Sequence, residues 1–600
     1  MNTLKKLLLL VCLLINATAF AQQKPVNMQY SVSMEKAADH LYHVELTSTA
    51  PGKTLDFKMC VWTPGYYQLI DFAGAVQNFT VTDSKGTALK YENPSKSVWR
   101  VYNTSGGPVK IAYDVKAVVP FVGNVYLDET RGYITPGGLF MYLDEELRHP
   151  VTIQMTPYSK WSKLVATGLD TIPGKYHVYK ADDFDVLYDS PFLMGELEVL
   201  PPFKVQNKPH DFIGYKLPAF DRQGFMDDLK KIVETGSGII GDIPYTHYAF
   251  LSIGAGGGGI EHLNSSSLSF SGGEGFNTPD ARKKLYNFIA HEYFHHYNVK
   301  RIRPVELGPF DYSKENHTNM LWVSEGFTVY YEYLITRRAG IMSPEDMFGD
   351  LQTNLRNYEN KPGHLYQSAT QASYYTWGDG PNGRVNEDFN KTISYYDKGP
   401  ILGLMLDFNI RHATKNKKSL DDVMRLLYYK YYKQLKRGFT EEEFRSECEK
   451  MAGTPMPELF EYASTVKPPN YPKYFAYGGL NIDTNTIVTS TVWDGLNVRQ
   501  QKDTLRINTV DYQSPAWDAG VRGRTKILTI NGAPASRDVL YKTYETSKAG
   551  NTITLGLEKD GVKKDVTITL TEKREKNYKI TPMANMDALQ ADIYKSWIGK

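Results

Sequence analysis

The sequence predicts a multidomain α+β protein with a β-rich N-terminal region, a largely helical central region and a small β-rich C-terminal region. Its 600 residues are too many for one hydrophobic core, because domains contain about 150 residues. Short alternating stretches separated by Gly, Pro and Asp fill the chain up to residue 195, and segments with helical periodicity follow them. Strand-like alternation returns after residue 475, so the three regions differ in fold class.

The first 21 residues are typical of a secretory signal peptide. Two lysines precede an apolar run from Leu7 to Ile15, and an Ala-Phe-Ala segment that ends at Ala21 supplies a cleavage site. The apolar run is shorter than the ~20 residues that cross a membrane. The sequence therefore predicts an exported protein, periplasmic or secreted, that is cleaved near Ala21.

The composition of the mature chain excludes two classes of partner. Cleavage removes two of the 69 basic residues and none of the 67 acidic ones, which leaves 67 of each. A chain without net charge lacks the basic surface that nucleic acid requires. No later run of 18 apolar residues occurs, so we expect no membrane span in the mature chain. Cys60 and Cys448 remain as candidates for one disulfide, although they fall in different predicted domains.

The mature chain divides into four predicted segments. Residues 22–195 contain alternating stretches such as YHVELTSTA and VTIQMTP, which indicate a mainly antiparallel β domain. Residues 196–465 contain the helical segments. The proline-rich stretch VKPPNYPKY, residues 466–474, is predicted to be a linker. Residues 475–575 form a small β-rich module, and residues 576–600 end in a predicted helix.

The motif HEYFH indicates a metal site in the central region. His291 and His295 lie about one helical turn apart, so both project from the same face and can hold one metal ion. Glu292 can act as general base toward a water at that metal. The alternative is a pair of structural histidines, and a third ligand decides between the two. His296 points about 100° away from His295, so we expect it to pack in the interior.

A third ligand is available in LWVSEGFTVYYE. A catalytic zinc ion usually has three protein ligands and a water. Glu325 begins the next predicted helix, where Trp322 and Val323 would bury its surroundings. We therefore predict one Zn²⁺ ion bound by the two histidines and Glu325. Glu332, two turns further on, is predicted to accept a hydrogen bond from a ligand imidazole.

These motifs carry a family resemblance. HEYFHHYNVKRIRP together with WVSEGFTVYY resembles the gluzincin metallopeptidases, and more narrowly the M61 family, the glycyl aminopeptidase group. Over most of the mature chain the resemblance implies a β domain with WTPGYY, a thermolysin-like zinc peptidase domain with a helical region, and a C-terminal PDZ domain. It implies an aminopeptidase that acts on peptides with a free N-terminus, with Gly or Ala indicated by the family name. The sequence departs from the family at Tyr297, where Trp is common.

The resemblance also implies a role for the glycine run GGGGIEHL. Related aminopeptidases carry a Gly-x-x-Glu-Asn segment on a strand edge beside the zinc, which implies that Glu261 binds the substrate α-amine. Gly258 and Gly259 would let the substrate backbone approach closely. His262 stands where relatives often have Asn, and it either lines the same pocket or only orients Glu261. Without the resemblance, a mobile loop with an incidental acid remains the alternative.

A Tyr-x-Lys-Gly segment completes the expected active site. In gluzincin aminopeptidases this segment supplies a phenol that hydrogen-bonds the tetrahedral oxyanion. The match in SYYDKGPILGL implies that Tyr396 is the donor, with Tyr395 as the alternative.

The C-terminal module resembles a PDZ domain through DGLNV and the segment INTVDYQSPAWDAGVRGRTKILTINGAP. PDZ domains bind peptide C-termini by strand addition. The module either binds a peptide or protein ligand or serves as a structural cap, and Arg524-Thr525 replaces the usual Gly-Asp before its hairpin. Two other functions therefore remain open, a PDZ-directed zinc endopeptidase and a non-catalytic peptide-binding scaffold.

Overall fold

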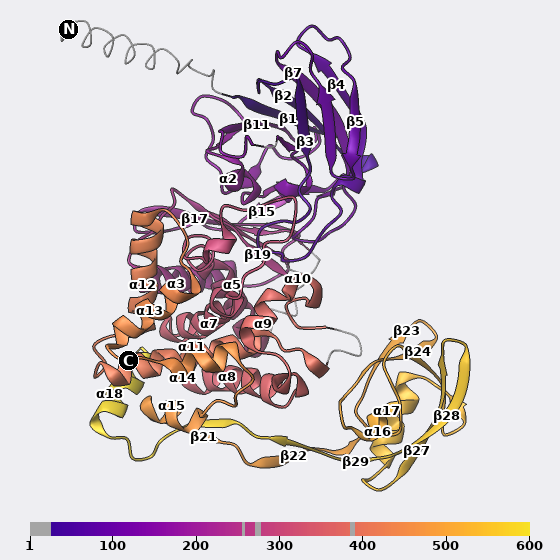
Figure 1. Ribbon diagram of the computed structural model, residues 1–600, viewed down its shortest axis with the longest axis vertical. Helices are drawn as coiled ribbons and strands as arrows, with labels where there is room; N and C mark the ends of the chain where they lie inside the picture. Colours follow the sequence, from indigo (N-terminus) through magenta and orange to yellow (C-terminus); the bar gives the residue numbers. More distant parts are fainter. Residues whose placement is uncertain (1–25, 144, 255–257, 270–277, 385–389, 600) are drawn as a thin grey trace, which may run out of the picture.

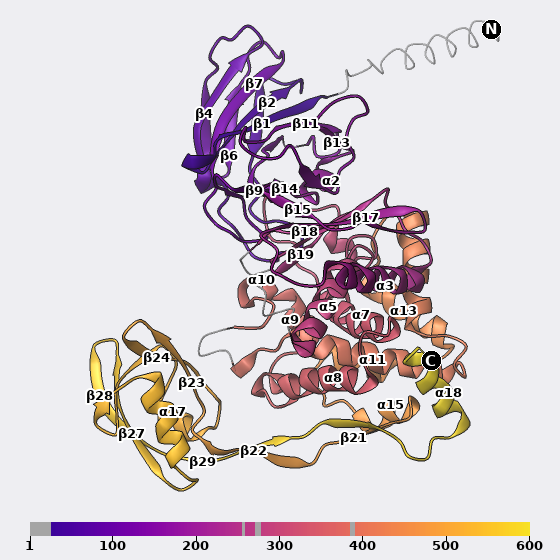
Figure 2. The ribbon, with the colours of Figure 1, turned by 180° about the vertical axis from the view of Figure 1, so that it is seen from behind.

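The structure is a computed structural model that describes residues 26–143, 145–254, 258–269, 278–384 and 390–599. The predicted signal peptide and its cleavage site lie outside these residues. Figures 1 and 2 show a β-rich region at one end, a helical region beside it, and a small β module at the end of a two-stranded ribbon. The three regions follow one another along the chain in the predicted order.

The N-terminal region consists of three sheets. Their strand orders are β13-β11-β1-β2-β7-β4, β10-β3-β6-β5 and β12-β14-β9-β8. The strands are β1 (Met28–Lys36), β2 (Leu41–Ser48), β3 (Thr54–Lys58), β4 (Val76–Asp83), β5 (Tyr91–Ser95), β6 (Val98–Tyr102), β7 (Val109–Lys116), β8 (Tyr126–Leu127), β9 (Arg131–Ile134), β10 (Tyr142–Leu143), β11 (Val151–Thr156), β12 (Val165–Thr167), β13 (Val178–Ala181) and β14 (Phe192–Gly195). Among the described strands of these sheets only β1 and β11 pair in parallel, so the region is mainly antiparallel. A short helix, α2 (Phe184–Tyr188), precedes its last strand.

The central region begins with a sheet that the helical periodicity did not reveal. Its order is β15-β17-β18-β20-β19, with β16 paired to β17. The strands are β15 (Leu197–Val199), β16 (Phe203–Val205), β17 (Lys208–Tyr215), β18 (Tyr248–Ser252), β19 (Gly259–Glu261) and β20 (Ser265–Leu268). β17, β18 and β20 are parallel, and β19 is the antiparallel edge strand. β18 and β20 are buried along their whole length, so they lack the alternation that marks a half-exposed strand.

Helices fill the rest of the central region. They are α3 (Arg222–Ile240), α5 (Pro279–Phe294), α6 (Leu321–Ser324), α7 (Gly326–Arg338), α8 (Pro344–Glu359), α9 (Ala369–Tyr374), α10 (Thr376–Asp379), α11 (Tyr395–Ala413), α12 (Leu420–Leu426), a π-helical segment (Leu427–Leu435), α13 (Glu441–Ala452), α14 (Pro457–Ser464) and α15 (Tyr471–Tyr477). α5 begins as its sequence predicts, since Thr278 accepts a hydrogen bond from the N–H of Ala281 and Pro279 occupies the first turn.

The predicted linker at residues 466–474 does not end the helical region. Tyr471 begins α15, and its ring and those of Tyr474 and Phe475 are buried in the same core as the other helices. The prediction of a linker rested on the prolines of this stretch, but proline is also favourable in the first turn of a helix. Pro472 occupies that position in α15. The connection to the C-terminal module begins only after α15.

A two-stranded ribbon carries the C-terminal module (Figure 1). In it β21 (Leu480–Asp483) pairs with β30 (Lys579–Pro582), and β22 (Thr486–Trp493) pairs with β29 (Thr571–Lys576). The module has the strand order β23-β24-β25-β27-β28. Its elements are β23 (Leu496–Gln501), β24 (Thr504–Val510), α16 (Pro515–Asp518), β25 (Thr525–Ile530), β26 (Ala533–Pro534), α17 (Arg537–Thr546), β27 (Thr552–Lys559) and β28 (Val562–Thr569).

The chain then returns to the helical region as α18 (Ala588–Trp597). Trp597 is fully buried, and its indole N–H donates to the hydroxyl of Tyr330 at 2.8 Å. Buried apolar side chains from the N-terminal region to Ile598 form one continuous core, whereas the module has a core of its own. The N-terminal and central regions are therefore packed into one body.

Two smaller expectations can be compared with the structure. Cys60 and Cys448 are both buried free cysteines, so no disulfide joins them. In the described part of the chain, none of the helices combines the length and the apolar composition needed to cross a membrane.

Candidate active site

Three predicted metal ligands converge between α5 and α7. The Nε2 atoms of His291 and His295 are 2.9 Å apart, and the Glu325 Oε2 lies 3.7 Å and 3.1 Å from them, respectively. Two donors bound about 2.0–2.1 Å from a tetrahedral zinc ion lie about 3.3 Å apart, so the three distances fit such an ion. We call these residues the metal triad. All three are buried, and they form a group whose chemistry suits Zn²⁺.

Hydrogen bonds orient both imidazoles. The Nδ1 of His291 is 2.7 Å from the Glu332 carboxylate, and the Nδ1 of His295 is 2.7 Å from the carbonyl of Asn298. Because both partners accept, each Nδ1 carries the proton and each Nε2 presents its lone pair to the metal position. Glu332 therefore has the position expected for it.

Asn298 fixes the distance between the two helices of the triad. Its side-chain amide donates to the carbonyls of Val323 and Ser324 at 2.9 and 3.0 Å. These carbonyls directly precede Glu325, so the end of the α5 segment is tied to the position of the third ligand. These contacts exist only after folding, so the sequence by itself does not reveal this role of Asn298.

A close helix crossing brings Tyr396 to the triad. A Cβ at Gly326 would lie 2.5 Å from the Cα of Gly399, so α7 and α11 approach to a distance that only glycine permits. The Tyr396 hydroxyl consequently donates to the Glu325 Oε2 at 2.9 Å. Tyr395 instead hydrogen-bonds Thr376 at 2.9 Å. Of the two tyrosines, Tyr396 is the one in contact with the triad.

Glu292 is buried beside the edge strand of the sheet. Its Oε2 has no hydrogen-bond partner. The pKa of its carboxyl is raised to about 8, mainly by burial, because this effect together with the charges of Glu261 and Glu325 exceeds the lowering by His291 and His295. A Cβ at Gly259 would lie only 2.5 Å from the Glu292 Oε1. The backbone of β19 thus passes directly over this carboxylate, as a close approach at glycine predicts.

Glu261 lies two residues further along the same strand, on the same side as Gly259. It is 4% exposed, and its Oε1, which makes no hydrogen bond, forms an ion pair with the Lys300 Nζ at 3.5 Å. The glycine of WTPGYY packs against it, since a Cβ at Gly65 would lie 2.8 and 3.0 Å from its two carboxylate oxygens. The N-terminal region therefore contacts the site directly. Gly258, with φ of +77°, precedes the strand.

His262 directly follows β19. Its Nδ1 lies 3.3 Å from Asp189 and its Nε2 lies 3.2 Å from the Ser267 hydroxyl. Both ring nitrogens thus have partners inside the protein, which favours a structural role for His262 over contact with substrate. His296 packs as expected, since its buried ring bonds the Tyr293 carbonyl through Nδ1.

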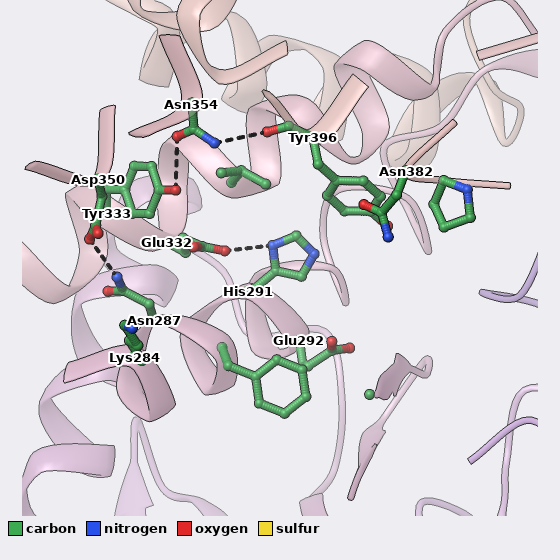
Figure 3. Close-up of a pocket in the computed structure, with 14 residues that line it drawn as sticks. Lys284, Asn287, His291, Glu292, Glu332, Tyr333, Asp350, Asn354, Asn382 and Tyr396 are labelled. Carbon is green, nitrogen blue, oxygen red and sulfur yellow. Dashed lines mark hydrogen bonds and ion pairs between the residues drawn. The ribbon is translucent and has the colours of Figure 1, made fainter. Parts of the chain in front are cut away.

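A cavity of about 530 Å³ opens beside the metal position (Figure 3). His291, Glu292, Tyr396 and Gly259 line it on the side of the triad. Its remaining lining comes largely from α5, α7 and α8 and is mostly polar. This lining includes Asn287, Asp350, Asn354, Tyr333 and Asn382. The cavity gives a substrate access to the predicted catalytic residues.

The fold and the site define a metallopeptidase of the HExxH type with a downstream glutamate. The family model of the M61 peptidase N-terminal domain matches residues 29–196, and that of the M61 glycyl aminopeptidase matches residues 284–402. The second range contains the metal triad, Glu292 and Tyr396, whereas Glu261 lies outside both. The segment that holds the metal triad is therefore similar to the M61 glycyl aminopeptidase domain.

One solved structure shares the fold over nearly the whole chain. A crystal structure of an aminopeptidase N family protein from Idiomarina loihiensis has a TM-score of 0.86 and 24% identity, covering 95% of this chain and 100% of that chain. An M1 zinc metallopeptidase from Deinococcus radiodurans has a TM-score of 0.45 and 12% identity, covering 75% and 95%. Yeast LTA4 hydrolase in complex with Bestatin has a TM-score of 0.45 and 14% identity, covering 75% and 67%. No curated protein sequence matches the chain.

Proposed function

We propose that the protein is an exported zinc-dependent aminopeptidase that removes small N-terminal residues, Gly or Ala, from peptides. The observation that carries this proposal is the arrangement of strand β19, in which Gly259 touches Glu292 and Glu261 follows on the same side. Two residues of a strand span about 7 Å. That span leaves room for one aminoacyl residue between an amine held by Glu261 and a carbonyl beside Glu292.

Each step of the proposed reaction has a candidate residue. A bound zinc ion would polarise the scissile carbonyl and make water more acidic. Glu292 accepts a proton from the attacking water and passes it to the leaving amine. Tyr396 donates its hydroxyl to the developing oxyanion, and burial raises the pKa of this phenol so that it stays protonated.

The narrow surroundings of Glu261 support the preference for small residues. Gly65 packs against both the Glu261 carboxylate and the Ile260 side chain, and Glu261 is nearly inaccessible to solvent. A substrate whose first side chain is large would displace these groups. Export is supported by the composition of the first 21 residues.

We also propose that the C-terminal module is a PDZ domain that binds a peptide or protein ligand. Its support is the edge position of β23, which leaves one side of that strand open for another strand, and the packing of α17 beside it.

A panel of aminoacyl chromogenic substrates tests the enzymatic proposal. We expect fastest hydrolysis of the Gly and Ala compounds, loss of activity with a chelator and recovery with Zn²⁺. N-acetylated forms of the same compounds should be cleaved at least about 100-fold more slowly, because they carry no cationic amine. Equal cleavage of free and acetylated substrates would identify an endopeptidase, and no cleavage by the zinc-loaded protein would favour a binding scaffold.

A further inference from the structure

Three buried charged side chains meet at the proposed amine site. The Lys300 Nζ lies 2.9 Å from the Asp189 Oδ1 and 3.5 Å from the Glu261 Oε1. Asp189 follows α2 of the N-terminal region, Glu261 ends β19, and Lys300 follows α5. Their exposed fractions are 7%, 4% and 9%, so water screens their interactions very little.

Lys300 by itself would oppose the proposed function. A lysine beside Glu261 would neutralise that carboxylate and repel the ammonium group of a substrate. Burial disfavours the charged form of Lys300, but Asp189 and Glu261 outweigh this effect and raise its pKa. Lys300 is therefore a cation, and the net charge of the site depends on what compensates it.

Asp189 provides this compensation. It is the nearer of the two carboxylates to Lys300, and it is also 3.3 Å from the Nδ1 of His262. Burial lowers the pKa of His262, so this ring is neutral and donates to Asp189 without adding charge. The two carboxylates and the ammonium then sum to one negative charge, which matches the single positive charge of a substrate α-amine.

We propose that Asp189 and Lys300 are positioning residues of the amine site. Lys300 holds one oxygen of Glu261 in place, and Asp189 offsets the charge of Lys300 so that Glu261 keeps its charge for the substrate amine. This inference rests on the proposed function of Glu261. It assigns the N-terminal region a part in substrate recognition, beyond covering the site.

A charge-balanced pair of variants tests the inference. Asp189→Asn leaves Lys300 and Glu261 as a neutral pair, so we expect KM for glycine p-nitroanilide to rise at least about tenfold while kcat changes less than threefold. The double variant Asp189→Asn/Lys300→Met restores one negative charge, so its KM should fall at least about threefold below that of Asp189→Asn, while it stays above the wild-type value because Lys300 no longer holds Glu261. A purely structural role predicts the opposite, namely that the double variant is the more impaired.

Asp114→Asn is the matched control. Asp114 is a buried aspartate of the N-terminal region that also contacts a lysine and a histidine, Lys36 at 3.1 Å and His43 at 2.7 Å. It should leave KM unchanged, and thermal melting and zinc content show whether each variant is folded.

The outcomes separate this inference from the proposed function. If the wild-type enzyme cleaves the acetylated substrate as fast as the free one, the role of Glu261 itself is wrong. The role of Glu261 is supported if the wild-type enzyme requires the free amine and Glu261→Gln abolishes this requirement. If, in addition, Asp189→Asn keeps the wild-type KM, or the double variant has a KM no lower than that of Asp189→Asn, only the inference about Asp189 and Lys300 is wrong.

Discussion

Gly259→Ala is the substitution that most directly tests how strand β19 and Glu292 depend on each other. The new Cβ would lie 2.5 Å from the Glu292 Oε1 and 2.5 Å from the Phe288 ring. Ordinary contact begins at 3.4 Å, so the carboxylate oxygen has to move by about 0.9 Å. The end of a flexible side chain can move this far without unfolding the protein.

Displacement of the Glu292 carboxylate is expected to reduce the catalytic rate. Misplacing a catalytic group by about 1 Å reduces the rate by about 100-fold, which corresponds to about 2.7 kcal/mol of transition-state free energy. We therefore expect kcat to fall about 100-fold, while the metal triad, whose atoms are not among the three nearest to the new methyl, still binds zinc.

The assay is steady-state hydrolysis of glycine p-nitroanilide together with zinc content and thermal melting. Gly238→Ala is the control, because its Cβ meets nothing within 4 Å and an alanine in α3 is expected to stabilise the helix slightly. A Gly259→Ala enzyme with kcat within threefold of the wild-type value would refute the close contact between β19 and the general base.

Four further substitutions test the remaining roles. Glu292→Gln should retain zinc and lose turnover by about 10²- to 10⁴-fold, measured with the same substrate, and near-native activity would exclude Glu292 as the base. Tyr396→Phe should lower kcat by about 10²- to 10³-fold. Tyr395→Phe should instead lower the free energy of unfolding by about 1 kcal/mol, with little effect on kcat. The reverse pattern would show that Tyr395 is the oxyanion donor. Glu332→Ala should weaken zinc binding by about 10- to 100-fold in competition with a chelator, and unchanged affinity would show that its bond to His291 is unimportant.

The local part of the site could be predicted from the sequence because helical geometry is local. His291 and His295 share a face at any place in a protein where HEYFH is helical, and Glu332 follows Glu325 by two turns. The start of α5 could be predicted for the same reason, since Thr278 and Pro279 act within one turn.

Predictions that depended on distant contacts were less successful. The proline-rich stretch before residue 475 was expected to be a linker, but α15 is stabilised by burial of Tyr474 and Phe475 in a core that the local sequence does not reveal. The strands β18 and β20 could not be predicted from the sequence, because burial on both faces removes the alternation of polar and apolar residues.

The sequence by itself determined the proposed chemistry of this protein, since it contains the metal triad, the proposed general base Glu292 and a glycine-rich segment ending in Glu261. The tertiary structure alone decided which tyrosine reaches Glu325, through the contact of Gly326 with Gly399, and which groups surround Glu261. Asp189 and Gly65 come from the N-terminal region, far from Glu261 in the chain. Their effect on the charge and space at the amine site depends on distances of a few ångströms, and only packing sets distances between such distant segments.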